Sequence, residues 1–183
     1  VSRGAGLDYS AFSIIDITEY PFKQVLTYRN NQISYVIYPD IIWRLVSKYN
    51  NAYVLVEIND IGEAVVDILN DEFEYDNLIA TECADKYGYG VRTTKKVKRM
   101  GCSILKDMVE QKKLIVQDSN TIDEFGQFVM KGSSYEADSG HDDLVMGLVI
   151  FAWLVGQDSF TEINDSNFRD RVYSDNVQMM EEQ

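Results

Sequence analysis

The sequence predicts an α/β layer fold with a mixed sheet, in which an antiparallel hairpin forms one edge and later strands run parallel. Two β-rich segments at residues 9–17 and 23–29 flank a turn at residues 19–21, which is the pattern of a hairpin. From Pro39 onward, helical and extended patterns alternate, as they do in α/β layers. A chain of 183 residues, 45% of them hydrophobic, is long enough to bury the core of one such domain.

The elements after the hairpin follow from local patterns. Pro39 stands where a helix begins, and apolar residues after it recur at helical spacing. Residues 52–58 are almost all apolar, which is typical of a central strand covered on both faces. A turn at residues 59–62 then leads into a predicted helix at 63–69, and a short strand is predicted at 78–81.

A basic helix is predicted in the middle of the chain, beginning near Thr93. Its apolar positions recur three and four residues apart, as on the buried face of an amphipathic helix. The loop before it, residues 86–90, is rich in glycine and tyrosine. Tyr87 and Tyr89 either contact a binding partner or pack beneath the loop, and the sequence favours neither. A strand at 114–117 follows the helix.

The last third of the chain contains a short helix, a hairpin and a long apolar helix. The helix at 121–128 opens with Thr121 and has Glu124 three residues later, which is a capping-box pattern. The hairpin is expected at 129–138, where it would border a groove. The apolar helix runs from about residue 142 to residue 156 and is too short to span a membrane.

Composition excludes several classes of protein. The single histidine rules out a multi-histidine zinc site, and no basic and apolar leader of a secretory signal is visible. The net charge of −13 argues against a protein that coats nucleic acid nonspecifically. The abrupt start at Val1 indicates a fragment of a longer protein, with one domain at residues 1–160 and a peripheral acidic tail at 161–183.

Carboxylates stand at the ends of two apolar elements. Glu57 lies at the end of the predicted central strand, and Asp142 and Asp143 open the apolar helix. Ligands of α/β sheets gather beyond strand ends, so these positions suit a binding site. The alternative for Asp143 is helix stabilisation, because an acid in a first turn gains about 0.3–1 kcal/mol from the helix dipole. Together with Asp8, these acids predict a divalent metal site.

Convergent carboxylates need a cation between them. Unit charges about 4 Å apart repel by roughly 1 kcal/mol in bulk water and about 4 kcal/mol at an effective dielectric of 20. Mg²⁺ (or Mn²⁺) prefers such oxygen ligands, and two ions about 3.5–4 Å apart assist phosphodiester cleavage. We therefore predict two ions, with Glu57 and Asp143 as catalytic ligands and Asp142 and Asp8 as further ligands. His141 either shuttles protons or contacts a phosphate, or it caps the helix.

Positive charge is concentrated in one part of this acidic chain. Lys and Arg side chains that neutralise phosphates supply most nonspecific DNA affinity. The alternative is a solvated helix face, which is what most charge runs are. The predicted DNA-binding residues are Arg92, Lys95, Lys96, Lys98 and Arg99, with Arg3, Lys86 and Lys131 as further candidates.

Three segments resemble the nuclease domain of the large terminase subunit of T-even-like tailed bacteriophages. They are Ser2-Arg3-Gly4-Ala5-Gly6-Leu7-Asp8-Tyr9, Val56-Glu57-Ile58-Asn59 and His141-Asp142-Asp143-Leu144-Val145-Met146. The resemblance covers residues 1–160 and implies an RNase H/resolvase-like fold. It further implies a Mg²⁺-dependent, sequence-nonspecific endonuclease that cuts concatemeric viral DNA at the start and end of packaging.

The resemblance also implies a catalytic triad of acids and a set of partners. The second acid falls on Glu57 and the third on Asp143, whereas the first falls immediately before Val1, outside this chain. The expected partners are double-stranded DNA, an ATPase domain in the same full-length chain, the portal and the small terminase subunit. This chain holds no G-x-x-x-x-G-K-S/T phosphate loop. The expected location is the host cytoplasm during virus assembly.

Two alternative functions remain open on the sequence. A noncatalytic DNA-clamping or docking module of the packaging motor would explain a chain that lacks the first acid. A junction-specific resolvase would share both the fold and the acidic site. DNA binding without cleavage would favour the first alternative, and a preference for four-way junctions would favour the second.

Overall fold

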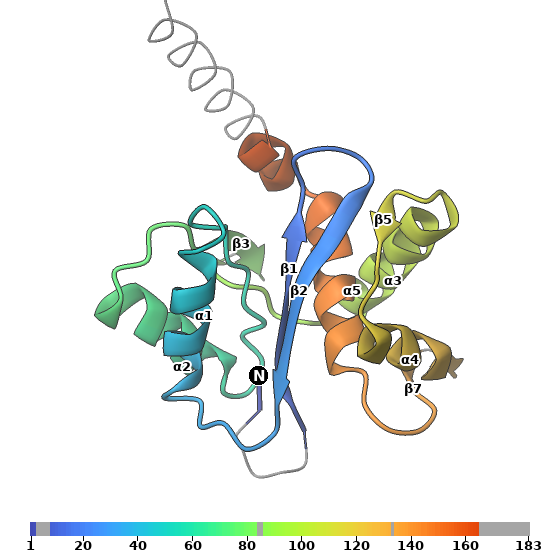
Figure 1. Cartoon of the computed structure of the whole chain (residues 1–183), viewed down its shortest axis with the longest axis horizontal. Helices are drawn as coiled ribbons and strands as arrows, with labels where there is room; N and C mark the ends of the chain where they lie inside the picture. Colours follow the sequence, from blue (N-terminus) through green and yellow to red (C-terminus); the bar gives the residue numbers. More distant parts are fainter. Residues whose placement is uncertain (3–7, 84–85, 133, 165–183) are drawn as a thin grey trace, which may run out of the picture.

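A three-stranded mixed sheet runs through the middle of the molecule (Figure 1). The structure is a computed structural model that describes residues 1–2, 8–83, 86–132 and 134–164, without the side chains of Cys83 and Lys86. Strand β1 (Ser10–Asp16) pairs antiparallel with β2 (Phe22–Asn30), and β2 pairs parallel with β5 (Leu114–Ile115). The predicted hairpin is therefore confirmed, and the sheet is mixed as expected.

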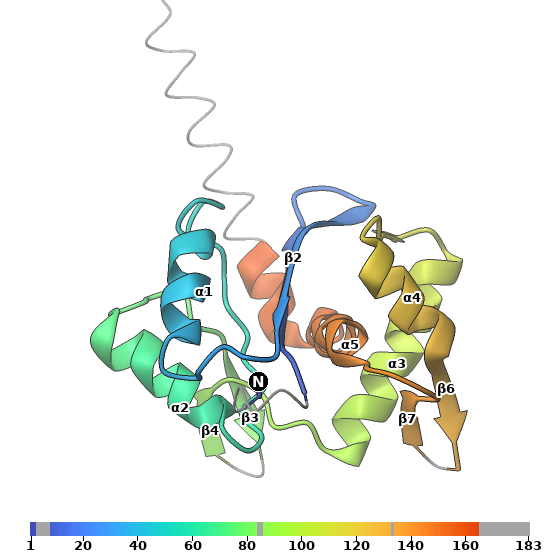
Figure 2. The same cartoon turned by 60° about the horizontal axis from the view of Figure 1, so that its bottom comes forward.

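Helices cover both faces of this sheet. Helix α5 (Asp143–Val155) packs on β1 and against α3 (Lys95–Glu110), with α4 (Ser119–Gln127) beside it (Figure 2). Gly101 permits the close approach of α3 to α5, because a Cβ there would lie 2.3 Å from the Val149 carbonyl oxygen. The main core forms around the almost fully buried α5.

The opposite face is covered by α1 (Tyr38–Val46), α2 (Gly62–Asp67) and the π-helical turn η1 (Ile68–Glu72). Pro39 lies in the first turn of α1, as predicted. The fully buried Tyr38 packs against the stacked rings of Phe12 on β1 and Tyr28 on β2, with centroids 6.0 and 6.1 Å away. These contacts join the second core cluster to the sheet.

Residues 52–58 are extended but do not form the regular central strand that we predicted. Isolated parallel bridges join Val54 to Leu78 and Glu57 to Val91. The N–H of Ile79 donates to the Val54 carbonyl at 2.9 Å, and the N–H of Val91 donates to the Val56 carbonyl at 2.8 Å. The segment is thus bonded along one edge, through its even-numbered residues, in the part of the chain that the structure describes. The two bridges are isolated and have no consecutive ladder pairs between them, so the segment is not a regular strand.

Two further hairpins complete the fold. Strand β3 (Ala80–Cys83) pairs with β4 (Lys86–Tyr89), so most of the segment that we predicted as a Gly/Tyr loop is a strand. Alternate tyrosines suit a strand, and the glycines had masked that pattern. Strand β6 (Phe128–Lys131) pairs with β7 (Ser134–Ala137), which confirms the other predicted hairpin.

The N-terminal cap of α4 differs from expectation. The side chain of Asp118, not that of Thr121, accepts the N–H of residue 121 and caps α4.

A short helix at Asp158–Asn164 crosses the boundary predicted at residue 160 and places Phe160 in the core. Among the described residues, no single helix is long and apolar enough to cross a membrane; only α5 with this short helix, bent by 88°, meets that measure.

Candidate metal and nucleic-acid site

One cavity of about 1440 Å³ separates β1 from the extended segment at residues 53–57. Residues 11–16 of β1 line one side, residues 53–57 line the other, and α5 contributes apolar side chains. Glu57, Asp142 and Asp143 all contribute to its lining. Three of the predicted metal ligands, from chain segments more than 80 residues apart, therefore border the same space.

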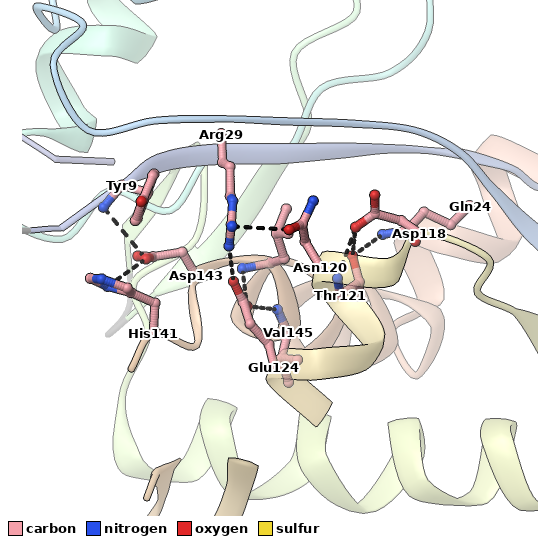
Figure 3. Close-up of polar contacts among 11 residues, drawn as sticks. Tyr9, Gln24, Arg29, Asp118, Asn120, Thr121, Glu124, His141, Asp143 and Val145 are labelled. Carbon is pink, nitrogen blue, oxygen red and sulfur yellow. Dashed lines mark hydrogen bonds and ion pairs between the residues drawn. The ribbon is translucent and has the colours of Figure 1, made fainter. Parts of the chain in front are cut away.

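Asp143 begins α5 and is held by contacts from two sides (Figure 3). Its Oδ2 accepts the backbone N–H of Tyr9 at 3.4 Å and lies 3.6 Å from Nδ1 of His141. The imidazole in turn meets the Tyr9 ring edge to face, with centroids 4.8 Å apart. Burial raises the pKa of the Asp143 carboxyl, and Asp142 and Asp8 add to this rise, while Tyr9 and His141 oppose it.

The first turn of α5 receives its cap from another helix. The Oε2 atom of Glu124, on α4, accepts the N–H groups of Leu144 at 2.8 Å and of Val145 at 3.1 Å. Arg29 donates to Oε1 of the same carboxylate at 3.2 Å. The capping box that we predicted for Glu124 is therefore wrong, because this side chain leaves its own helix and serves α5. The sequence held one signal of this role, because Glu124 occupies a position on the buried face of its helix, where an unpaired acid would be unfavourable.

Glu57 is positioned by tight packing of the turn that follows it. A Cβ on Gly62 would lie 1.8 Å from the Glu57 carbonyl oxygen, so only glycine fits at this contact. Asn59 and Thr93 exchange two hydrogen bonds, Asn59 Nδ2 to the Thr93 carbonyl at 3.1 Å and Thr93 N–H to Asn59 Oδ1 at 2.8 Å. This turn is thereby joined to the start of α3. Sequence analysis had not identified these supporting residues.

The donor set fits Mg²⁺ in part. Carboxylate oxygens are the ligands that Mg²⁺ prefers, and this ion commonly takes one or two carboxylates and keeps several waters. Glu57 and Asp143 supply two such groups. Among the described residues, no group of three or more His, Cys, Asp or Glu side chains could hold a metal ion. Asp8 and His141 do not line the cavity, although both influence the Asp143 carboxyl electrostatically.

Helix α3 brings positive charge to the same cavity. Lys95, Lys98 and Arg99 line it, and their spacing of three and four residues places them on one helix face. Arg92 and Lys96 are exposed but lie outside the lining. The salt bridges found in the described part of the chain include none of these five cations. Lys98 does lie over the Phe128 ring, 5.8 Å from its centroid, but no carboxylate in that part of the chain neutralises these charges.

The other predicted DNA contacts do not add free positive charge to the cavity in the described part of the chain. Lys131 lies 3.4 Å from Asp138 and 3.9 Å from Glu136, so its charge is already balanced locally. Arg3 and the side chain of Lys86 lie outside the described residues. Tyr87 is 80% exposed on β4, which excludes the packed alternative for this tyrosine.

Comparisons with known proteins point to one family. The family model described as the terminase RNase H-like domain matches residues 1–151. The large terminase nuclease of thermophilic phage G20c with bound cobalt is 25% identical, with a TM-score of 0.64 over 81% of this chain and 76% of that chain. The same nuclease with bound magnesium gives 24% identity and a TM-score of 0.66 over 83% and 77%. The large terminase nuclease domain of Thermus phage P74-26 gives 24% and 0.61 over 81% and 74%.

Proposed function

This chain belongs to the terminase RNase H-like domain family, and we propose that it cuts DNA during viral genome packaging as a metal-dependent endonuclease domain. One observation carries the assignment to these residues. Glu57 and Asp143 line a single cavity together with the unpaired cations of α3. Acids for a divalent ion and cations for phosphates are the two components that phosphodiester hydrolysis requires.

The residues divide the chemistry between them. Glu57 and Asp143 would hold Mg²⁺ or Mn²⁺, with Asp142 and Asp8 close by, and two ions would supply a Lewis acid and an activated water. Lys95, Lys98 and Arg99 would bind backbone phosphates, which carry no base identity, so cleavage would be sequence-nonspecific. His141 already contacts Asp143 through one nitrogen. Its other nitrogen would move a proton or contact a phosphate.

The cavity also supports a third acid from upstream of Val1. Among the described residues, β1 lies at the edge of its sheet and residues 53–57 are bonded along one edge only. Val1 lines the space between them. An extended segment in this cavity would pair with both edges. The acid that the resemblance places immediately before Val1 would then lie beside Glu57 and Asp143. Native upstream residues should therefore strengthen metal binding by this chain.

The biological setting follows the resemblance to T-even-like phages. The substrate would be concatemeric double-stranded DNA, cut at the start and end of packaging. The partners would be an ATPase domain in the same polypeptide, the portal and the small terminase subunit, all in the host cytoplasm. The motifs around Asp8, Glu57 and Asp143 support this lineage.

Plasmid cleavage tests the function directly. The chain with its native upstream residues is incubated with plasmid and Mg²⁺, with and without chelator, beside Glu57→Gln. We expect nicking and linearisation that chelator and the substitution both abolish. Chelator-insensitive cutting, or full activity of Glu57→Gln, would contradict the proposal. DNA binding without cleavage would favour the noncatalytic clamp, and a strong preference for four-way junctions would favour a resolvase.

A further inference from the structure

An ion pair between the buried Glu124 and the partly exposed Arg29 lies beside the candidate metal site (Figure 3). The Glu124 side chain is 5% exposed, and both of its oxygens are engaged. Its partner Arg29 also donates to Oδ1 of Asn120 at 3.0 Å and lies over the Tyr9 ring, 5.0 Å from the centroid. These residues come from β2 and α4, and neither side chain lines the cavity. Their contacts nevertheless converge on the residues that hold Asp143.

We propose that Glu124 and Arg29 are positioning residues that set the place of the Asp143 carboxylate for metal binding. The inference rests on the proposed function, because it concerns the same site. Glu124 acts through the backbone, since it accepts the N–H groups of the two residues that follow Asp143. Arg29 acts through Tyr9, whose ring it covers and whose N–H donates to Asp143.

The cap supplied by Glu124 leaves the acids of α5 available. The first turn of a helix has N–H groups without intrahelical partners, and an Asp at the N-cap normally accepts one of them. Here the N-cap residue is Asp142, yet its side chain makes no capping hydrogen bond. Because Glu124 satisfies these donors from α4, Asp142 and Asp143 can both turn toward the cavity that they line.

Arg29 makes this arrangement electrostatically tolerable. Burial raises the pKa of the Glu124 carboxyl and Asp143 adds to the rise, whereas the two N–H donors and Arg29 oppose it. Two carboxylates from different elements thus lie near each other before any metal is bound. The Arg29 guanidinium, which binds both Glu124 and Asn120, offsets part of the repulsion between the Glu124 and Asp143 carboxylates.

Metal affinity separates a positioning role from a general contribution to stability. Mn²⁺ binding is measured by electron paramagnetic resonance in the chain with its native upstream residues. Binding that is lost in Asp143→Asn defines the site. The test variants are Glu124→Ala and Glu124→Gln, and the control is Leu69→Ala, which opens a cavity in the other core cluster. Hydrogen exchange at the Leu144 and Val145 amides, measured without metal, reports whether the hydrogen bonds to Glu124 are present.

We expect Glu124→Ala to weaken Mn²⁺ binding at this site by about 10–100-fold, as loss of supporting groups around metal ligands commonly does. Glu124→Gln keeps one acceptor oxygen and should give an intermediate loss, and both variants should exchange the Leu144 and Val145 amides faster. Leu69→Ala should lower thermal stability and leave affinity unchanged. Equal affinity in Glu124→Ala and Leu69→Ala would overturn the inference.

The same measurements distinguish this inference from the proposed function. Plasmid cleavage by the unmodified protein, combined with unchanged Mn²⁺ affinity in Glu124→Ala, would overturn the positioning role alone. Weakened Mn²⁺ binding in Glu124→Ala, combined with no cleavage by the unmodified protein, would support positioning and overturn the nuclease.

Discussion

The two carboxylates that line the cavity are supported in different ways. Asp143 begins a buried helix, and its surroundings come from other elements through Tyr9 and Glu124, with His141 two residues before it. Glu57 lies on an extended segment that is bonded along one edge, and its support comes from the turn immediately after it. Asp143 is thus positioned by long-range packing and Glu57 by local backbone geometry. Substitutions should therefore affect the two halves of the site through different mechanisms.

The largest expected effect is the loss of cleavage when either carboxylate is neutralised. Asp143→Asn and Glu57→Gln should each lower the rate of plasmid cleavage by about 10²–10³-fold, because several kcal/mol of charge stabilisation depends on the metal that they hold. Asp107→Asn, at an exposed position of α3, is the matched control and should leave the rate unchanged. If only one of the two variants loses activity, the carboxylates do not share an ion.

The local support of Glu57 can be broken by one methyl group. Gly62→Ala should lower the free energy of unfolding by about 1–3 kcal/mol, because the new Cβ would overlap the Glu57 carbonyl oxygen. Gly126→Ala is the control, since no atom lies within 4 Å of a Cβ there, and it should stabilise α4 by about 0.4–1 kcal/mol. Urea unfolding measures both variants. A neutral Gly62→Ala would mean that Glu57 depends less on this turn than the packing indicates.

The cations of α3 should contribute to DNA binding independently of how Glu57 and Asp143 are supported. Lys95→Ala combined with Arg99→Ala should reduce the slope of log affinity against log salt by about 2, because two fewer phosphates are neutralised. Lys106→Ala, on the same helix but paired with Glu110 at 3.7 Å, should leave the slope unchanged. Fluorescence anisotropy with a labelled duplex measures the slope. Equal slopes in the double variant and the control would show that this face does not contact phosphates.

Asp143→Asn, which should abolish cleavage, should stabilise the metal-free fold, because the Asp143 carboxyl is largely buried. The raised pKa of Asp143 means that the folded chain binds this proton more tightly than the unfolded chain does. The free energy of unfolding therefore falls as pH rises from the pKa of the unfolded chain, about 3.9, through the higher pKa of the folded chain. Without metal, Asp143→Asn should therefore be more stable at neutral pH by about 0.5–2 kcal/mol. Urea unfolding in EDTA at several pH values should show the difference vanish below about pH 4. Saturating Mg²⁺ should stabilise only the unmodified chain.

The smallest expected effect is that of Lys131→Ala. Asp138 and Glu136 already balance this charge, so the salt slope of DNA binding should change by less than about 0.5. The anisotropy titration described for α3 measures it. A change as large as that of one α3 cation would mean that DNA displaces the two acids and engages the β6–β7 hairpin.

Local patterns in the sequence were sufficient for most elements and for the family. Alternation predicted the β1–β2 hairpin, helical spacing predicted the helix after Pro39, and a continuous apolar run predicted α5, because these patterns are set within a few residues. The RNase H-like fold and membership of the terminase family are confirmed by the family match. The metal-binding and catalytic roles of individual residues and the cellular location stay predictions.

What local patterns could not predict are the contacts between elements. Glu124 has a capping-box spacing within its own helix, yet it binds α5 because packing brings α4 there and buries its carboxylate. Residues 52–58 have the composition of a central strand, but a regular strand needs neighbours along its length, and here it has single bridges. The sequence by itself determined most of the helices, the β1–β2 and β6–β7 hairpins, and which acids stand at the ends of elements. Only the tertiary structure decided which acids line the cavity and which cations join them, because those choices depend on contacts between residues far apart in the chain.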